Sequence, residues 1–293
     1  MPTLSELLAS APYVLSDGAM GTMLQEAGLD DGGAPELWNV ERPEAIAAIH
    51  ERYLQAGARI ITTNTFGGTR PRLVMHGLED RVHELSRAGA QIARAAAEPF
   101  GALVAGDVGP SGELLEPLGT MTAAEAQALF AEQVRGLVEG GIDLVLIETM
   151  SDLGEVEAAV KAAQEVAPGL PIIVTLSFDT KLRTMMGVTP AAAVEALAAL
   201  GVTGVGANCG RGPGELETVM GQMAQARPDG LLLVAQSNAG LPQLVGDRFE
   251  YDARPAEMAE HALRLRALGV DIIGACCGST PDHVHAMREA VAG

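Results

Sequence analysis

Eight apolar runs, each followed by a stretch with helical periodicity, limit the folds open to this 293-residue chain. Runs such as Leu144–Ile147 and Leu231–Ala235 are continuously apolar, which is typical of parallel strands buried on both faces. The expected strands are 14–18, 59–65, 103–107, 143–148, 172–178, 204–208, 231–236 and 270–275. The main expected helices are 43–56, 80–97, 122–139, 152–166, 189–200, 213–226, 255–268 and 281–291.

This alternation predicts an α/β fold built as a single (β/α)8 TIM barrel, with the active site at the carboxyl-terminal ends of the strands. We expect one domain over residues 1–293, because no low-complexity linker divides the chain. A doubly wound open sheet is the main alternative, but no Gly-x-Gly-x-x-Gly turn follows the first strand. The connections 28–39 and 238–254 are long and are expected to overhang the barrel mouth.

Polar and reactive residues collect just after the apolar runs, where a barrel would bring them to one face. They are Asp17-Gly18, Thr63–Thr65, Asp107, Glu148-Thr149, Ser177, Asn208-Cys209, Gln236–Asn238 and Cys276-Cys277. All three cysteines of the chain belong to this group, and glycines flank each position. The strand ends are therefore the expected place of the chemistry.

The three cysteines supply the ligand count of a catalytic zinc site, which takes three protein ligands and leaves one position open. Glycines around Cys276 and Cys277 permit an irregular turn that directs both sulfurs, with that of Cys209, at one ion. We therefore expect these residues to bind Zn²⁺, which activates a small thiol substrate. Two alternatives stay open, namely buried free cysteines of the core and a cysteine nucleophile. All six histidines fall on expected helices or beside them, which disfavours a Cys-His pair.

Asp17 and Glu148 each end an apolar run, where a carboxylate is costly unless a cation or a hydrogen-bond donor meets it. Beside a zinc-thiolate site, their simplest use is to hold the ammonium group of an amino-acid substrate. Capping of the following helix is the alternative. Backbone amides from Gly18 onward are suited to the substrate carboxylate. Asn238 is expected either to orient the substrate or donor, or to satisfy loop backbone groups.

Five motifs carry a resemblance to one enzyme family. They are Leu15–Thr22 (LSDGAMGT), Thr63–Phe66 (TNTF), Glu148-Thr149, Gly206–Cys209 (GANC) and Gly274–Gly278 (GACCG). On these motifs the chain resembles the zinc-dependent homocysteine S-methyltransferase family over nearly its whole length. Gln236–Pro242 and Tyr251–Ala253 look most like the homocysteine-binding domain of cobalamin-dependent methionine synthase. Ala275 stands where that family usually has glycine before the paired cysteines.

The resemblance implies a (β/α)8 barrel in which the catalytic residues and zinc ligands are Cys209, Cys276 and Cys277. It also implies that the homocysteine-binding positions are Asp17, Gly18 and Glu148, and that Asn238 fills the open zinc position when substrate is absent. The implied reaction transfers a methyl group to the thiol of L-homocysteine and yields L-methionine.

The methyl donor is expected to be methylcobalamin from a separate corrinoid protein or cobalamin module. The chain has no Asp-x-His-x-x-Gly cobalamin motif, so we expect no cofactor-binding residues for the corrinoid within it. Betaine or S-methylmethionine is the alternative donor, but an aromatic content of 3% makes a cage for a quaternary ammonium hard to build. Alternatives from other classes are a non-catalytic barrel with a structural zinc and a phosphate-binding lyase or aldolase. No lysine stands at a strand end, which argues against a Schiff-base aldolase.

A net charge of −19 argues against nucleic acid or an anionic membrane as a partner, because no basic patch is available to release counterions. The sequence contains no transmembrane run and no signal peptide at its start. Three cysteines, two of them adjacent, make a poor disulfide framework. We therefore expect a cytoplasmic protein.

Overall fold

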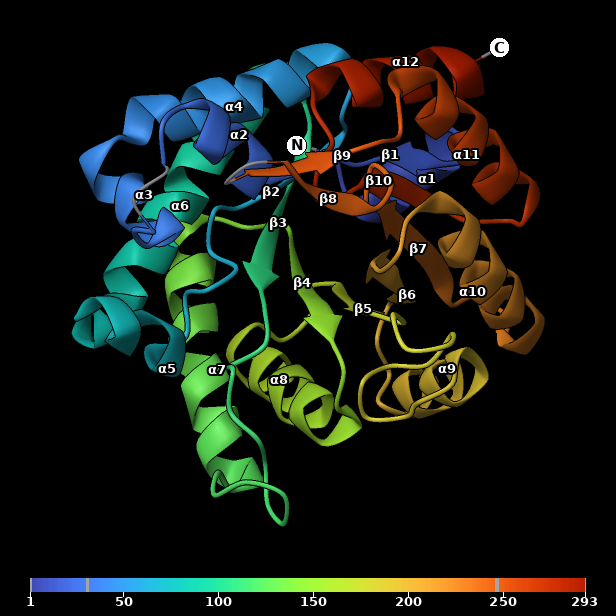
Figure 1. The fold of residues 1–293 in the computed structure, drawn as a ribbon. Coiled ribbons are helices and arrows are strands. Elements are labelled where there is room, and N and C mark those ends of the chain that lie inside the picture. The colour runs from blue at the N-terminus through green and yellow to red at the C-terminus, as the bar shows by residue number, and fades with distance from the viewer. Residues whose placement is uncertain (1, 30–31, 246–247, 293) are drawn as a thin grey trace.

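The computed structural model describes residues 2–29, 32–245 and 248–292 and contains a parallel eight-stranded barrel (Figure 1). The strand order is β1-β10-β7-β6-β5-β4-β3-β2. These strands are β1 (Val14–Leu15), β2 (Ile60–Thr62), β3 (Leu103–Val108), β4 (Leu144–Met150), β5 (Ile172–Leu176), β6 (Gly204–Cys209), β7 (Leu232–Ser237) and β10 (Ile272–Ala275). A parallel bridge between Ser16 and Ile60 joins the two ends of the order and closes the barrel. The predicted TIM-barrel fold is confirmed.

Among the described residues, eight helices of ten or more residues follow the strands and surround the barrel. They are α4 (Pro43–Ala56), α6 (Val82–Ala97), α7 (Ala123–Gly140), α8 (Leu153–Val166), α9 (Pro190–Ala199), α10 (Pro213–Ala226), α11 (Pro255–Ala267) and α12 (Pro281–Ala292). Each expected helix is present, and α4 and α10 have the predicted bounds. The predicted capping box of α7 is formed, since Thr122 and Glu125 exchange hydrogen bonds between side chain and backbone. In the described part of the chain, no helix has both the length and the apolar content needed to cross a membrane.

The two long connections contain regular structure that the sequence patterns do not reveal. Residues 238–254 include an antiparallel hairpin of β8 (Pro242–Val245) and β9 (Arg248–Tyr251). The 28–39 connection includes the 3-10 helix η1 (Pro35–Leu37) and the start of α3 (Trp38–Glu41). Each of these elements has only three or four residues, which is too short to produce a readable period.

The barrel interior is packed at its amino-terminal end. Alternate strand residues, including Val14, Leu103 and Ile272, form a cluster that is separate from the larger layer between strands and helices. Leu4 and Leu7 belong to this inner cluster and come from α1 (Leu4–Ser10), which covers the amino-terminal opening. A ligand can therefore enter the barrel only from the carboxyl-terminal end.

Candidate functional site

A cavity of about 370 Å³ lies at the carboxyl-terminal ends of the strands. It is lined by residues at or just beyond the carboxyl-terminal ends of β1, β2, β3, β4, β6 and β10, among them Asp17, Thr63, Asp107, Glu148, Cys209 and Cys276. Its size falls in the lower part of the range for small-molecule sites. The barrel therefore brings most of the polar strand ends singled out in the sequence into one place.

The three cysteine sulfurs meet in this cavity. The Sγ atoms of Cys209 and Cys276 are 2.9 Å apart, those of Cys276 and Cys277 are 3.9 Å apart, and all three lie within 4.8 Å of one another. Hydrogen bonds from Cys209 and Cys276 lower the pKa of Cys277 to about 3, so the cluster carries negative charge. Three converging, half-buried sulfurs that carry negative charge fit a thiophilic divalent cation such as zinc.

Strained backbone directs Cys209 toward the cluster. Cys209 ends β6 with φ 57°, and Thr149 in β4 has φ 61°; non-glycine residues rarely adopt this left-handed region. Asn208 links the ends of β4 and β6, which lie on either side of β5. Its Oδ1 accepts from the Thr149 backbone N–H at 2.9 Å, and its Nδ2 donates to Thr149 Oγ1 at 2.7 Å. The buried Asn208 amide thus supports both strained positions.

The paired cysteines lie in an irregular turn after β10, as the flanking glycines predict. Cys276 N–H donates to Ser237 O at 2.7 Å, while Cys277 O accepts from Ala239 N–H at 2.9 Å. Gly278 has φ 79° and donates through its N–H to Thr22 Oγ1 at 2.9 Å. Contacts to the ends of β7 and to α2 (Met20–Glu26) therefore fix a turn that brings both sulfurs to one side.

Three carboxyl groups lie in the cavity beside the sulfurs, of which Asp17 and Asp107 are buried and Glu148 is half-buried. Burial raises the pKa of Asp17 to about 7, although Asp17 accepts hydrogen bonds from Thr62 N–H at 2.7 Å and Thr62 Oγ1 at 3.0 Å. Burial, with the charges of Asp17 and Cys277, raises the pKa of Glu148 to about 8. Burial and the charge of Glu148 also raise the pKa of Asp107. In the described part of the chain, no arginine or lysine forms an ion pair with these carboxyls. These carboxyls are therefore available to bind a cationic group of a ligand.

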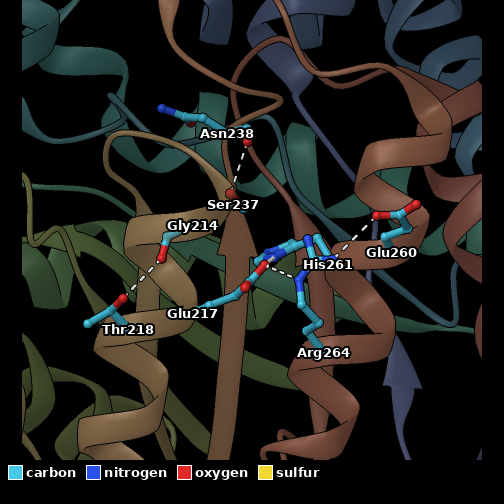
Figure 2. A network of polar contacts seen from close by, with 8 residues as sticks. All are labelled: Gly214, Glu217, Thr218, Ser237, Asn238, Glu260, His261 and Arg264. Atoms are coloured by element: carbon cyan, nitrogen blue, oxygen red, sulfur yellow. Dashed lines mark hydrogen bonds and ion pairs between the residues drawn. The ribbon is translucent and has the colours of Figure 1, made fainter.

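The two remaining predicted substrate residues occupy different surroundings. Gly18 lines the cavity, and a side chain there would overlap Ser279 Oγ and Tyr53, so only glycine fits. Asn238 lies just beyond β7 but is not among the lining residues (Figure 2). Its Nδ2 donates to Gly210 O at 2.8 Å, and its buried Oδ1 has no partner.

No imidazole in the described residues hydrogen bonds to a cysteine. Figure 2 shows His261 of α11 facing Glu217 of α10, with Nδ1 and Oε1 2.7 Å apart and Arg264 on the same carboxylate. His76, at the end of η2 (Val74–His76), lines the cavity but forms no hydrogen bond to a cysteine of the described residues. The expectation that the histidines lie on or near helices holds, and the site has no Cys-His pair.

Sequence reasoning did not single out several residues that line the cavity, among them the polar residues Thr62, Glu36 and Arg72. Thr62 orients Asp17, and Glu36 is a buried carboxyl that accepts from Gly67 N–H at 2.7 Å. Arg72, on α5 (Arg70–Leu73), is a cationic side chain of the lining. Thr62 lies inside an expected strand, and Glu36 and Arg72 lie in segments without a periodic signal. Only the polar interruption of an apolar run at Thr62 gave a cue.

Comparisons with known proteins agree with this geometry. The profile of the homocysteine S-methyltransferase family matches residues 14–291. The methionine synthase of Mycobacterium leprae is 36% identical over 99% of this chain, which spans 25% of that protein, and that of Mycobacterium tuberculosis is 35% identical over 97%. The Escherichia coli homocysteine methyltransferase MmuM in its metallated form has 25% identity and a TM-score of 0.81, with 97% of this chain and 98% of MmuM covered. The chain therefore belongs to the homocysteine S-methyltransferase family.

Proposed function

We propose that this chain binds L-homocysteine and a zinc ion, and that it transfers a methyl group to the homocysteine thiol to give L-methionine. The observation that carries the proposal is the meeting of three cysteine sulfurs and buried carboxyls in one cavity of a family barrel. A sulfur cluster alone fits a structural metal. The carboxyls beside it add a place for the ammonium group of an amino acid.

The chain's own residues would hold homocysteine at both ends. Asp17 and Glu148 would accept hydrogen bonds from the substrate ammonium, and the bound cation would favour their ionised forms over the protonated forms that burial favours. The backbone N–H groups that follow Gly18, at the start of α2, line the cavity and would donate to the substrate carboxylate. The thiol would then lie beside Cys209, Cys276 and Cys277.

Zinc held by Cys209, Cys276 and Cys277 would supply a Lewis acid that lowers the pKa of a bound thiol. In the overall reaction the homocysteine sulfur forms a bond to the methyl carbon, the bond between that carbon and its carrier breaks, and the thiol proton leaves. Because the cavity floor is closed by the packed barrel interior, the methyl carrier must approach from the mouth.

For the donor we propose methylcobalamin, presented by a corrinoid protein or module. Phe66 is the only Phe, Tyr or Trp side chain among the described residues that line the cavity. A betaine trimethylammonium group is best recognised by several aromatic faces, so this lining disfavours betaine. Single-turnover assays with free methylcobalamin, betaine and S-methylmethionine would separate the donors. Methionine formed only with betaine or S-methylmethionine would refute the corrinoid proposal.

The proposal is tested by metal analysis combined with X-ray absorption at the zinc edge. We expect one zinc per chain in reduced protein and its loss when Cys209, Cys276 or Cys277 is replaced by serine. Addition of homocysteine should add one sulfur to the zinc coordination shell. Absence of zinc from the reduced protein would refute the proposal. A zinc coordination shell that does not change when homocysteine is added would indicate a structural metal instead.

A further inference from the structure

The β8–β9 hairpin is attached directly to the loop that carries the paired cysteines. At the base of the hairpin, Ala239 N–H donates to Cys277 O at 2.9 Å, and Ala253 N–H donates to Ala239 O at 3.0 Å. Figure 1 shows the hairpin beside the ends of β7 and β10. The backbone on both sides of the hairpin is therefore linked to Cys277.

His283 provides a second link between the hairpin and this loop. Its Nδ1 lies 3.1 Å from Thr280 N, and its Nε2 lies 3.0 Å from Ala253 O. A backbone N–H can only donate and a carbonyl can only accept, so Nδ1 is the acceptor and Nε2–H is the donor. The buried imidazole of α12 thus joins Ala253, two residues after the hairpin, to Thr280 at the end of the cysteine loop.

Tyr251, the last residue of β9, brings its side chain to the cysteines. Its ring packs against Gly278, where a side-chain carbon would overlap it. Its hydroxyl lies within reach of the Cys277 sulfur. A thiolate or a metal-bound sulfur carries no proton, so in a hydrogen bond between the two groups the phenol is the donor and the sulfur is the acceptor.

We propose that Tyr251 is a positioning residue for the cysteine cluster, whose hydroxyl, carried by the β8–β9 hairpin, donates to Cys277 and fixes the direction of that sulfur. The inference rests on the proposed function, because it takes the cluster to be the zinc site. Residues that orient metal ligands in this way, when replaced, typically change metal affinity or activity by about 10- to 100-fold. The hairpin would thereby control how firmly the metal is held.

The test compares zinc affinity and the cobalt spectrum in the full chain with Tyr251→Phe, which keeps the ring on Gly278 and removes only the hydroxyl. In competition with a chromophoric chelator, we expect Tyr251→Phe to bind zinc about 10-fold more weakly. In the cobalt-substituted protein, the thiolate-to-cobalt charge-transfer band should move to lower energy, because the sulfur loses a hydrogen bond and becomes a stronger donor. A merely structural role would leave this band in place.

Tyr13→Phe is the matched control, because Tyr13 stacks on Arg266 at 5.6 Å and lies outside the cavity lining. It should behave as the unchanged protein in both measurements. Equal zinc affinity and equal cobalt spectra for Tyr251→Phe, Tyr13→Phe and the unchanged protein would overturn the inference. If the unchanged protein binds no zinc, the proposed function itself fails, so the two failures are distinguishable.

Discussion

Buried carboxyls that lack a cationic partner are the residues on which the site depends. Asp17 is 2% exposed, and its only donors among the described residues are Thr62 N–H, Thr62 Oγ1 and the backbone around it. Glu148 is raised in pKa by the same burial and by the charge of Asp17. Burial disfavours the ionised form of both carboxyls. A bound ammonium group would favour that form, so the two carboxylates are suited to bind it.

Glu148→Gln should raise the KM for homocysteine by about 10- to 100-fold, because a charge-assisted hydrogen bond contributes roughly 1.5–3 kcal/mol. The zinc content should not change, since Glu148 is not one of the sulfur ligands. Steady-state kinetics with varied homocysteine would measure the effect. Glu157→Gln, on the outer face of α8 and paired with Lys161, is the control and should leave the KM unchanged. Equal KM values for the two variants would contradict a role of Glu148 in ammonium binding.

Asp17→Asn should alter the pH dependence of stability. The folded-state pKa of Asp17 is about 7 and the ordinary value is 3.8, so the folded protein holds an extra proton between these pH values. Stability therefore falls as pH rises from about 4 to about 7, by about 1.4 kcal/mol per pH unit and roughly 4 kcal/mol in all. Asparagine cannot ionise and can keep both contacts to Thr62.

Urea unfolding of metal-free, reduced protein at pH 5, 6, 7 and 8 would measure this effect. The free energy of unfolding of Asp17→Asn, relative to the unchanged protein, should increase from pH 5 to about pH 7 and level off by pH 8. A difference that stays constant with pH would show that Asp17 ionises at its ordinary pKa in the folded chain.

The position of the three cysteines at strand ends could be predicted from the sequence, because the chain has only three and glycines flank them. The residues that orient the side chains and backbone of the site could not be predicted. Thr62 reads as an ordinary strand residue, and its role toward Asp17 depends on where β1 and β2 meet. Likewise, the strained φ of Thr149 depends on the Asn208 amide, which lies 59 residues further along the chain. Long-range contacts of this kind leave no local pattern.

At the scale of elements, the long helices and strands follow from local signals. The apolar period of α4 and α10 fixes their bounds, and the Thr122–Glu125 capping box marks the start of α7. The β8–β9 hairpin has no such signal. Its position depends on the Ala239–Cys277 hydrogen bond and on the packing of Tyr251 against Gly278, which arise only when the barrel has formed.

Thr122→Ala should lower the free energy of unfolding by about 1 kcal/mol, because the first turn of α7 loses the side chain that accepts from Glu125 N–H. Thr218→Ala is a matched change inside a helix, where the hydroxyl donates to Gly214 O at 3.1 Å on the exposed face of α10. It should have an effect near zero. Urea unfolding of both variants measures the difference. Equal losses in the two variants would contradict a capping contribution from Thr122.

At the scale of the whole molecule, the cysteine cluster joins distant parts of the chain. Cys209 ends β6 and Cys276 follows β10, and β7 lies between these strands in the barrel. A metal bound to all three sulfurs would therefore bind the folded chain far better than the unfolded chain, and would stabilise the barrel by mass action.

Removal of the metal should accordingly lower the unfolding temperature. A ligand present at 1,000 times its Kd contributes about 4 kcal/mol, which corresponds to roughly 10 °C for a chain of this size. Differential scanning calorimetry with and without a chelator would measure the shift. Cys209→Ser, which lacks one ligand, should show little response to the chelator. An equal response of this variant and the unchanged protein would contradict stabilisation through the cluster.

The closure of the barrel has a consequence for substrate binding. β1 has two residues, and it joins β2 through the Ser16–Ile60 bridge, with Arg59 N–H to Leu15 O at 2.8 Å and Asp17 N–H to Ile60 O at 3.1 Å. The Asp17 carboxyl adds two hydrogen bonds to Thr62 across the same seam. A substrate that keeps Asp17 ionised would strengthen those bonds, since a carboxylate accepts more strongly than a carboxylic acid. Homocysteine should then slow amide hydrogen exchange at Thr62. Substrate binding would in this way stabilise the contact between β1 and β2 that closes the barrel.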